Sequence, residues 1–162
     1  MVEVIKAAEF SDCGKYRYQL TRIWNDSKPV AMCIGLNPST ANSEKNDATI
    51  NWLINSLTHL GYGGLKMMNL YSFITPYPKD LQTAPMYPGV NDRWILSTAC
   101  NSQAVIFCWG AFKGLEYHAK KWAKIFPQAK CFGKNKGGSP WHPLALFRKG
   151  IKAKEAVLIE YK

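Results

Sequence analysis

Polar side chains capable of chemistry follow several short apolar segments of the sequence. Asn37 follows the segment 30–36, Asn69 lies at the end of another, and His142 lies in a loop near the end of the chain. Asp47 adds a carboxylate. Amides, an imidazole and nearby aromatic side chains suit recognition of a planar, polar ring such as a nucleobase, and a carboxylate can assist a water molecule.

Each of these residues also has an ordinary structural interpretation. An Asn-Pro pair after a strand, as at Asn37, is typical of a turn, and an isolated histidine such as His142 is commonly a packed or surface residue. Asp47 precedes a helical pattern and fits its N-cap. The functional interpretation therefore depends on whether the fold brings these residues together.

Four apolar runs of strand length could bring these residues together: 30–36, 65–70, 104–109 and 129–132. Each is nearly continuous, as expected of strands buried on both faces. Helical patterns lie between them at 47–61, 91–102 and 113–126. The alternation predicts an α/β fold, a three-layer αβα sandwich around a central, mainly parallel four-stranded sheet, in one domain over residues 1–162. Ligands of such sheets bind at the carboxyl ends of the strands, where the four following loops should meet.

Both ends of the chain should add edge strands. Residues 16–20 alternate between apolar and polar side chains, which predicts an N-terminal hairpin or edge strand with a turn at 11–14. Residues 155–161 could form another edge strand.

The formal charge of +10 is concentrated in the last third of the chain. Residues 113–162 hold 12 of the 21 Lys and Arg residues and 3 of the 11 Asp and Glu residues. Residues 1–112 hold the remaining 9 basic and 8 acidic residues, which nearly balance. Such asymmetry attracts polyanions and indicates a nucleic-acid surface, although a lysine-rich surface can also serve solubility. The phosphate-contact candidates are Lys120, Lys121, Lys124, Lys134, Lys136, Arg148 and Lys149.

Four segments resemble the ordered motifs of the uracil-DNA glycosylase superfamily: VAMCIGLNPS, MMNLYSF, AVIFCWGAF and SPWHPLAL. The resemblance implies the fold of that superfamily. It also implies that Asn37 positions or polarises the attacking water and that His142 stabilises negative charge on the departing base. It implies that Asn69 reads the base edge and that Leu146 wedges into the base stack. Asp47 is the alternative residue for holding the water.

The loops that follow the predicted strands extend the expected site. Further base-binding candidates are Tyr71, Phe73 and Trp109, and further DNA-backbone candidates are Ser39 and Thr40. More narrowly, CGKYRYQLTRIW, LNPSTA, NDAT and HPL look like a small family of bacterial and phage proteins classed as a domain of unknown function. That second resemblance carries no activity.

We therefore expect a DNA glycosylase that flips and hydrolytically releases a modified or damaged pyrimidine. The alternatives are a non-catalytic binder of nucleic acid or nucleotides, and a transferase that modifies a DNA base. DNA is the expected partner, and a monomer is favoured. The three histidines and five cysteines show no metal-ligand spacing, so neither metal nor cofactor is expected. Apolar runs too short to span a membrane and the lack of a secretory signal favour the cytoplasm.

Overall fold

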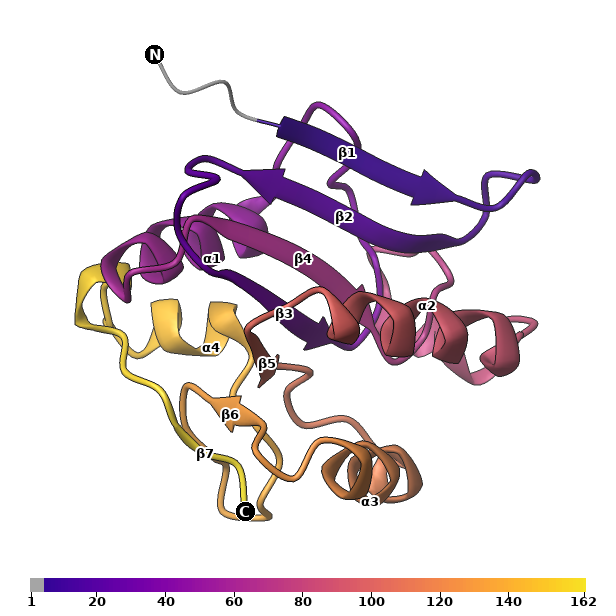
Figure 1. The fold of residues 1–162 in the computed structure, drawn as a ribbon. Helices are drawn as coiled ribbons and strands as arrows, with labels where there is room; N and C mark the ends of the chain where they lie inside the picture. The colour runs from indigo at the N-terminus through magenta and orange to yellow at the C-terminus, as the bar shows by residue number, and fades with distance from the viewer. Residues whose placement is uncertain (1–4) are drawn as a thin grey trace.

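The computed structural model describes residues 5–162 and consists of one mixed sheet with helices on both faces (Figure 1). The strand order is β1-β2-β4-β3-β5-β6-β7. The strands are β1 (Ile5–Phe10), β2 (Arg17–Ile23), β3 (Val30–Gly35), β4 (Gly64–Asn69), β5 (Ala104–Phe107), β6 (Lys130–Cys131) and β7 (Ile159–Glu160). The helices are α1 (Ala48–His59), α2 (Pro88–Cys100), α3 (Glu116–Ile125) and α4 (Pro143–Arg148), with 3₁₀ turns η1 (Pro78–Gln82) and η2 (Ala153–Glu155).

The α/β class is confirmed, but the expectation of a four-stranded sheet is wrong, because the sheet has seven strands. The four apolar runs give β3, β4, β5 and β6, which pair in parallel. The hairpin of β1 and β2 adds antiparallel strands beyond β4, and β7 pairs antiparallel with β6. The segments at both ends of the chain thus extend the parallel centre into a mixed sheet.

Two separate cores lie on the two faces of the sheet. Ala31 and Cys33 of β3 face a cluster that includes residues of α1 and α4. The intervening Met32 and Ile34 face a second cluster that includes residues of α2 and α3. Because successive strand side chains point to opposite faces, continuous apolar strands serve both clusters. The result is a three-layer arrangement with α1 and α4 on one side and α2 and α3 on the other.

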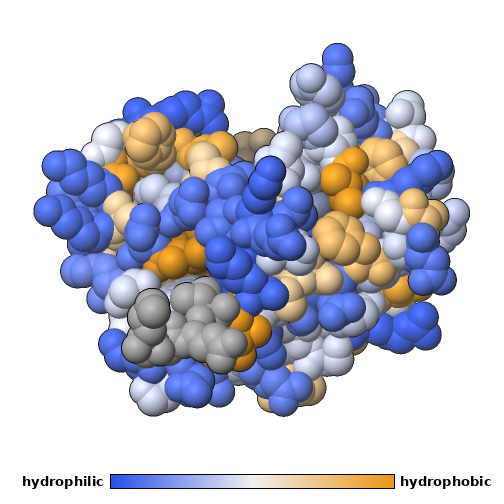
Figure 2. Space-filling model, turned by 90° about the horizontal axis from the view of Figure 1, so that it is seen from above, coloured by the Kyte–Doolittle hydropathy of each residue, from blue (hydrophilic) through white to orange (hydrophobic). Residues whose placement is uncertain are grey.

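β1 forms one edge of the sheet and carries the exposed charges Lys6 and Glu9. Figure 2 looks at the molecule from above, the side on which β1 lies in Figure 1. Hydrophilic side chains cover much of this face, and the hydrophobic ones form small separate groups. Charged edge strands discourage pairing with a strand of another molecule.

Within residues 5–162, every helix falls short of the length and apolar character required to cross a membrane.

Candidate active site

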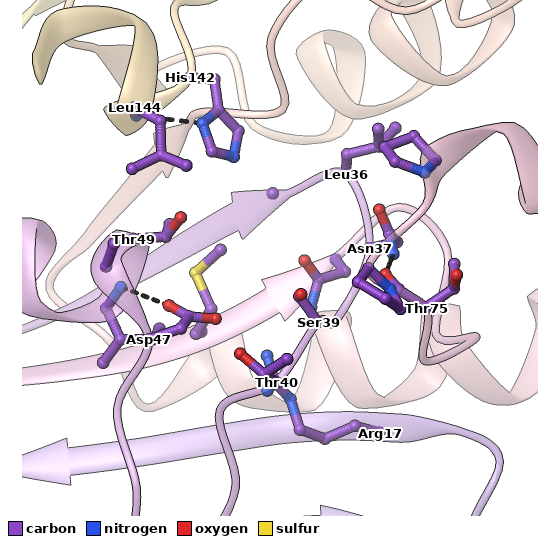
Figure 3. Close-up of a pocket in the computed structure, with 17 residues that line it drawn as sticks. Arg17, Leu36, Asn37, Ser39, Thr40, Asp47, Thr49, Thr75, His142 and Leu144 are labelled. Atoms are coloured by element: carbon purple, nitrogen blue, oxygen red, sulfur yellow. Dashed lines mark hydrogen bonds between the residues drawn. The ribbon is translucent and has the colours of Figure 1, made fainter. Parts of the chain in front are cut away.

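A cavity of about 410 Å³ lies at the carboxyl ends of β3 and β4, between the start of α1 and the start of α4. This volume is within the range of small-molecule sites. It brings together six of the residues singled out in the sequence: Asn37, Ser39, Thr40, Asp47, Asn69 and His142. Figure 3 shows His142 and Leu144 on one side and Arg17 on the other, with Asp47 and Asn37 flanking the space between them.

Asn37 is held by its amide nitrogen. This nitrogen donates to the carbonyl oxygens of Pro38, at 2.9 Å, and Thr75, at 2.8 Å. Because both partners are carbonyls, the nitrogen must face them, and Oδ1 stays available as an acceptor. Figure 3 shows the nitrogen directed toward Thr75. A fixed amide oxygen at a cavity wall can accept a hydrogen bond from a water molecule, which is what positioning a nucleophilic water requires.

Asp47 caps α1. Its Oδ1 accepts a hydrogen bond from the Ile50 backbone N–H at 2.9 Å, so the structural interpretation of this residue holds. The second carboxylate oxygen has no hydrogen bond to the described chain, and Asp47 lines the cavity. A single carboxylate can therefore stabilise the helix and also accept a proton or a hydrogen bond from a bound molecule.

His142 caps α4 through its ring. Its Nδ1 accepts a hydrogen bond from the Leu144 backbone N–H at 3.1 Å, so the proton of the neutral ring must lie on Nε2. Burial lowers the pKa of His142, nearby Arg148 lowers it further, and Asp47 opposes the shift. At neutral pH the ring is therefore uncharged and offers one donor, Nε2–H. Gly110 packs against it, since a Cβ there would lie 3.1 Å from the His142 Cβ.

Asn69 ends β4 at the bottom of the cavity. Its side chain is 2% exposed, and its Nδ2 has no protein partner. Gly35 pairs with it across β3 and β4, and a Cβ on this glycine would lie 2.9 Å from Asn69 Oδ1 and 2.5 Å from Met67 Cε. The absent side chain at Gly35 thus makes room for the amide. A buried donor without a partner costs about 1–3 kcal/mol, which a bound acceptor would offset.

Arg17 is a lining residue that the sequence analysis missed. Its side chain is 3% exposed, yet its Nε has no protein partner and its single hydrogen bond runs from Nη1 to the Ala41 carbonyl at 2.7 Å. Burial lowers the pKa of Arg17 to about 10, an effect that Asp47 partly opposes. The guanidinium is still charged at neutral pH, at a cost on the order of 3 kcal/mol.

A β-bulge in β2 turns Arg17 toward the cavity. Phe10 of β1 pairs with Arg17 and Glu9 pairs with Gln19, so Tyr18 is an extra residue in β2. As a consequence Tyr18 and Gln19 both reach α2, where Tyr18 stacks on Trp94 and Gln19 bonds Thr98. Strict alternation would have placed the Arg17 side chain on the same face of the sheet as Gln19, the face that α2 covers. The bulge places it on the α1 face with Leu20 instead.

Four of the predicted base-binding residues lie outside the cavity. Leu146 is 2% exposed in the core beneath α1, so it is not available as a wedge, and Trp109 is equally buried between Phe107 and Tyr161. Tyr71 lines a different cavity with His118, and Phe73 packs edge-on against Tyr16. These large apolar side chains pack in the core or beside it, whereas the cavity is lined by a mixture of small polar and apolar residues.

The basic candidates divide between the two faces of the sheet. Arg148 and Lys149 lie exposed at the end of α4, on the side of the cavity, with the Lys149 ammonium 5.0 Å from the centre of the Trp141 ring. Lys120 and Lys124 are exposed on α3, which packs on the other face. Lys121 forms an ion pair with Asp92, Lys134 donates to the carbonyls of Tyr161 and Lys162, and Lys136 is exposed.

Over residues 5–162, His, Cys, Asp and Glu side chains form no group of three that could hold a metal ion. The cavity instead offers neutral and charged hydrogen-bonding groups: donors on Arg17, Asn69 and His142, and acceptors on Asn37 and Asp47.

The part of the chain that forms this cavity matches a known sequence family. Residues 17–144 match a family described as "Protein of unknown function (DUF1643)", and the matched range contains all five of these hydrogen-bonding residues. No curated protein matches the chain, and no solved structure does. Because the family match covers well over half of its length, the chain belongs to the DUF1643 family.

Proposed function

We propose that the protein is a DNA glycosylase that hydrolyses the bond between a modified or damaged pyrimidine and its deoxyribose. The observation that carries the proposal is the cavity in which Asn37, Asp47, Asn69 and His142 meet at the carboxyl edge of the sheet. The resemblance of their motifs to those of the uracil-DNA glycosylase superfamily supports the same reaction and a fold of that superfamily.

The proposed reaction breaks the bond between C1′ of the sugar and N1 of the base. The electron pair leaves with the base, and a water oxygen bonds to C1′. Asn37 Oδ1 holds that water, and the free oxygen of Asp47 accepts its proton. The neutral His142 ring donates its Nε2–H to the base as negative charge develops. Interactions of this kind accelerate the reaction because they are stronger in the transition state than with bound substrate.

A second candidate function is a protein that binds a flipped base without cleaving it. It is favoured by one observation: Asp47 and His142 both cap helices, so each has a structural role that needs no chemistry. In that case the cavity would still read a base through Asn69, and no base would be released.

The test is incubation of the full chain with DNA duplexes that each carry a different modified pyrimidine. Released bases are measured by mass spectrometry, and abasic sites are revealed by alkali. Release of one base, leaving an abasic site, is the expected result. Tight binding to one of these duplexes without release would support the binder instead.

Variants of Asn37 and His142 separate catalysis from binding on the substrate so identified. Asn37→Ala and His142→Ala should each lower the single-turnover rate by about 100-fold or more, because each removes a group that acts on the transition state. DNA affinity should change little. For a binder, both changes should instead weaken recognition of the base by about 1–3 kcal/mol.

Asp47 needs a variant that preserves its cap. Asp47→Asn keeps an oxygen for the Ile50 N–H but removes the negative charge, so stability should change little while base release falls. Asp47→Ser also keeps a capping oxygen and removes the carboxylate, so base release should fall in this variant as well. Unchanged base release in both variants would exclude Asp47 as the proton acceptor. Asn37 would then be the residue that holds the attacking water.

A further inference from the structure

The inner end of the cavity holds a positive charge without a partner. Among residues 5–162 the side chains form one ion pair, between Lys121 and Asp92, so Arg17 has no carboxylate within ion-pair distance. Its Nε is unbonded, and its one hydrogen bond goes to a backbone carbonyl. Buried charges in proteins are normally paired. The unbonded Nε–H of this buried guanidinium is therefore suited to an acceptor that comes with a ligand.

Arg17 and Asn69 line the cavity from the neighbouring strands β2 and β4. The two strands pair at Leu20 and Met67, and beyond the bulge the Arg17 backbone N–H donates to the Ser72 carbonyl at 2.9 Å, three residues past Asn69. Both side chains are at most 3% exposed, and both line the cavity. They form what we call the cavity floor. Each of these two side chains has an unbonded N–H that a deeply bound molecule could satisfy.

The floor restricts the charge and shape of that innermost group. A guanidinium presents parallel N–H groups in one plane and prefers two coplanar acceptors. Asp47 lines the same cavity, so a doubly charged group such as a phosphate monoester would be repelled. A phosphodiester carries a sugar on both sides and is too bulky to reach side chains that are at most 3% exposed. A planar group with a single negative charge satisfies all three conditions.

We propose that the cavity floor binds a planar monoanion through Arg17 and Asn69; that this group belongs to a pyrimidine rests on the proposed function. The charge has two possible sources. It is either the ring itself, ionised as it departs from the sugar, or a carboxylate carried on a neutral ring. In either case Arg17, rather than the uncharged His142, supplies the full positive charge of the site.

Calorimetric titration of the full chain with free compounds tests this proposal at neutral pH. The probes are uracil, whose ring is neutral, 5-nitrouracil, whose ring is ionised, 5-carboxyuracil, which carries a carboxylate, and inorganic phosphate. We expect one or both planar anions to bind about 10-fold or more tightly than uracil, as for a hydrogen bond to a charged group. Preference for 5-nitrouracil would identify the ionised ring as the source of the negative charge. Preference for 5-carboxyuracil would identify a carboxylate substituent as its source.

Arg17→Gln should abolish this preference. Arg93→Gln removes one exposed positive charge on α2, on the face of the sheet away from the cavity, and is the matched control, which should keep the preference. Arg17→Lys retains the charge without the planar pair of donors, so it should keep only part of the preference and serves as a second, less disruptive variant. The proposal is overturned if neither anion is preferred, if the preference survives in Arg17→Gln, or if phosphate binds as tightly as the planar anions.

Failure of this proposal is distinguishable from failure of the proposed function. If the protein prefers the planar anions but releases no base from any duplex, the cavity floor is an anion site and the protein is not a glycosylase. Base release without anion preference would retain the glycosylase and exclude Arg17 as the anion site.

Discussion

Two buried arginines of β2 show how differently the same side chain is used. Arg22 is 1% exposed and donates to the side chain of Asn46 and to the carbonyls of Ala7, Thr21, Asn42 and Lys45. It fastens the segment that leads to α1. Arg17 is almost as buried and makes one hydrogen bond. A group that is buried, charged and poorly bonded is costly to the fold, which is typical of a functional site.

The two arginines should therefore differ in their effect on stability. Arg17→Met removes an unpaired buried charge, so we expect the free energy of unfolding to change by less than about 1 kcal/mol or to increase. Arg22→Met leaves several carbonyls without a donor and should cost at least about 3 kcal/mol. Urea denaturation of both variants measures the difference. Equal losses would show that Arg17 stabilises the fold as Arg22 does.

His142 should make stability depend on pH. Its pKa is lowered in the folded protein, mainly by burial, so below the ordinary value of about 6.5 the unfolded chain binds more protons than the folded one. Stability should then fall as the pH drops below about 6.5, by at most about 1.4 kcal/mol per pH unit for one group, until the folded pKa is passed.

His142→Asn keeps an acceptor at the N-cap and should reduce that slope. His118, whose pKa is also lowered by burial, contributes a similar slope of its own, and His118→Gln is therefore the reference variant. Thermal unfolding of the three proteins across acidic and neutral pH gives the comparison. An unaltered slope in His142→Asn would mean that the ring is not held neutral by its surroundings.

At the scale of the elements, β3 and β4 set the shape of the cavity through Gly35. A Cβ at this position would overlap Met67 Cε and approach Asn69 Oδ1, and the backbone conformation itself allows any residue. Gly35→Ala should consequently displace the Asn69 amide and cost about 1–3 kcal/mol of stability, as overpacking does.

The functional consequence of Gly35→Ala should exceed its effect on folding. Binding of the planar anions, and base release if it occurs, should fall by about 10-fold or more when the Asn69 contact is lost. Gly89→Ala is the matched control, since a Cβ there meets nothing within 4 Å. Unimpaired binding in a folded Gly35→Ala variant would show that Asn69 does not contact the ligand.

Elements with a strong pattern were predictable from the sequence, and those that depend on pairing were not. The continuous apolar runs gave the parallel strands, and Asp47 followed by helical spacing gave α1. The bulge at Tyr18 left no signal, because the period of two in 16–20 reads as regular alternation. Regular alternation would put the Arg17 side chain on the face opposite to the one that it occupies. The only available hint was a basic residue within an otherwise buried strand pattern.

The loops at the carboxyl edge were predictable as a group but not individually. The motifs placed Asn37, Asn69 and His142 at one edge, where the cavity is. Trp109 and Leu146 belong to the same motifs, yet burial of their large apolar surfaces places them in the core. A motif fixes the position of a residue along the chain, whereas the direction of its side chain depends on packing.

At the scale of the whole molecule, the positive charge of the last third of the chain is spread over two faces. His142 is the N-cap of α4, and the exposed Arg148 and Lys149 at the end of this helix lie on the face of the sheet that carries the cavity. α3 carries its exposed lysines on the other face. Under the proposed function, a DNA strand whose base enters the cavity would pass close to α4, and salt would screen charges farther away than about 10 Å.

The two groups of basic residues should consequently differ in their effect on DNA binding. A double variant, Arg148→Gln with Lys149→Gln, should weaken affinity for a duplex and lower the slope of log affinity against log salt by about 1.8, which is 0.9 for each lost phosphate contact. Lys120→Gln with Lys124→Gln removes the same charge from α3 and should leave the slope unchanged. Equal reductions would place α3 in the interface as well, and the bound DNA would then have to extend across both faces of the sheet.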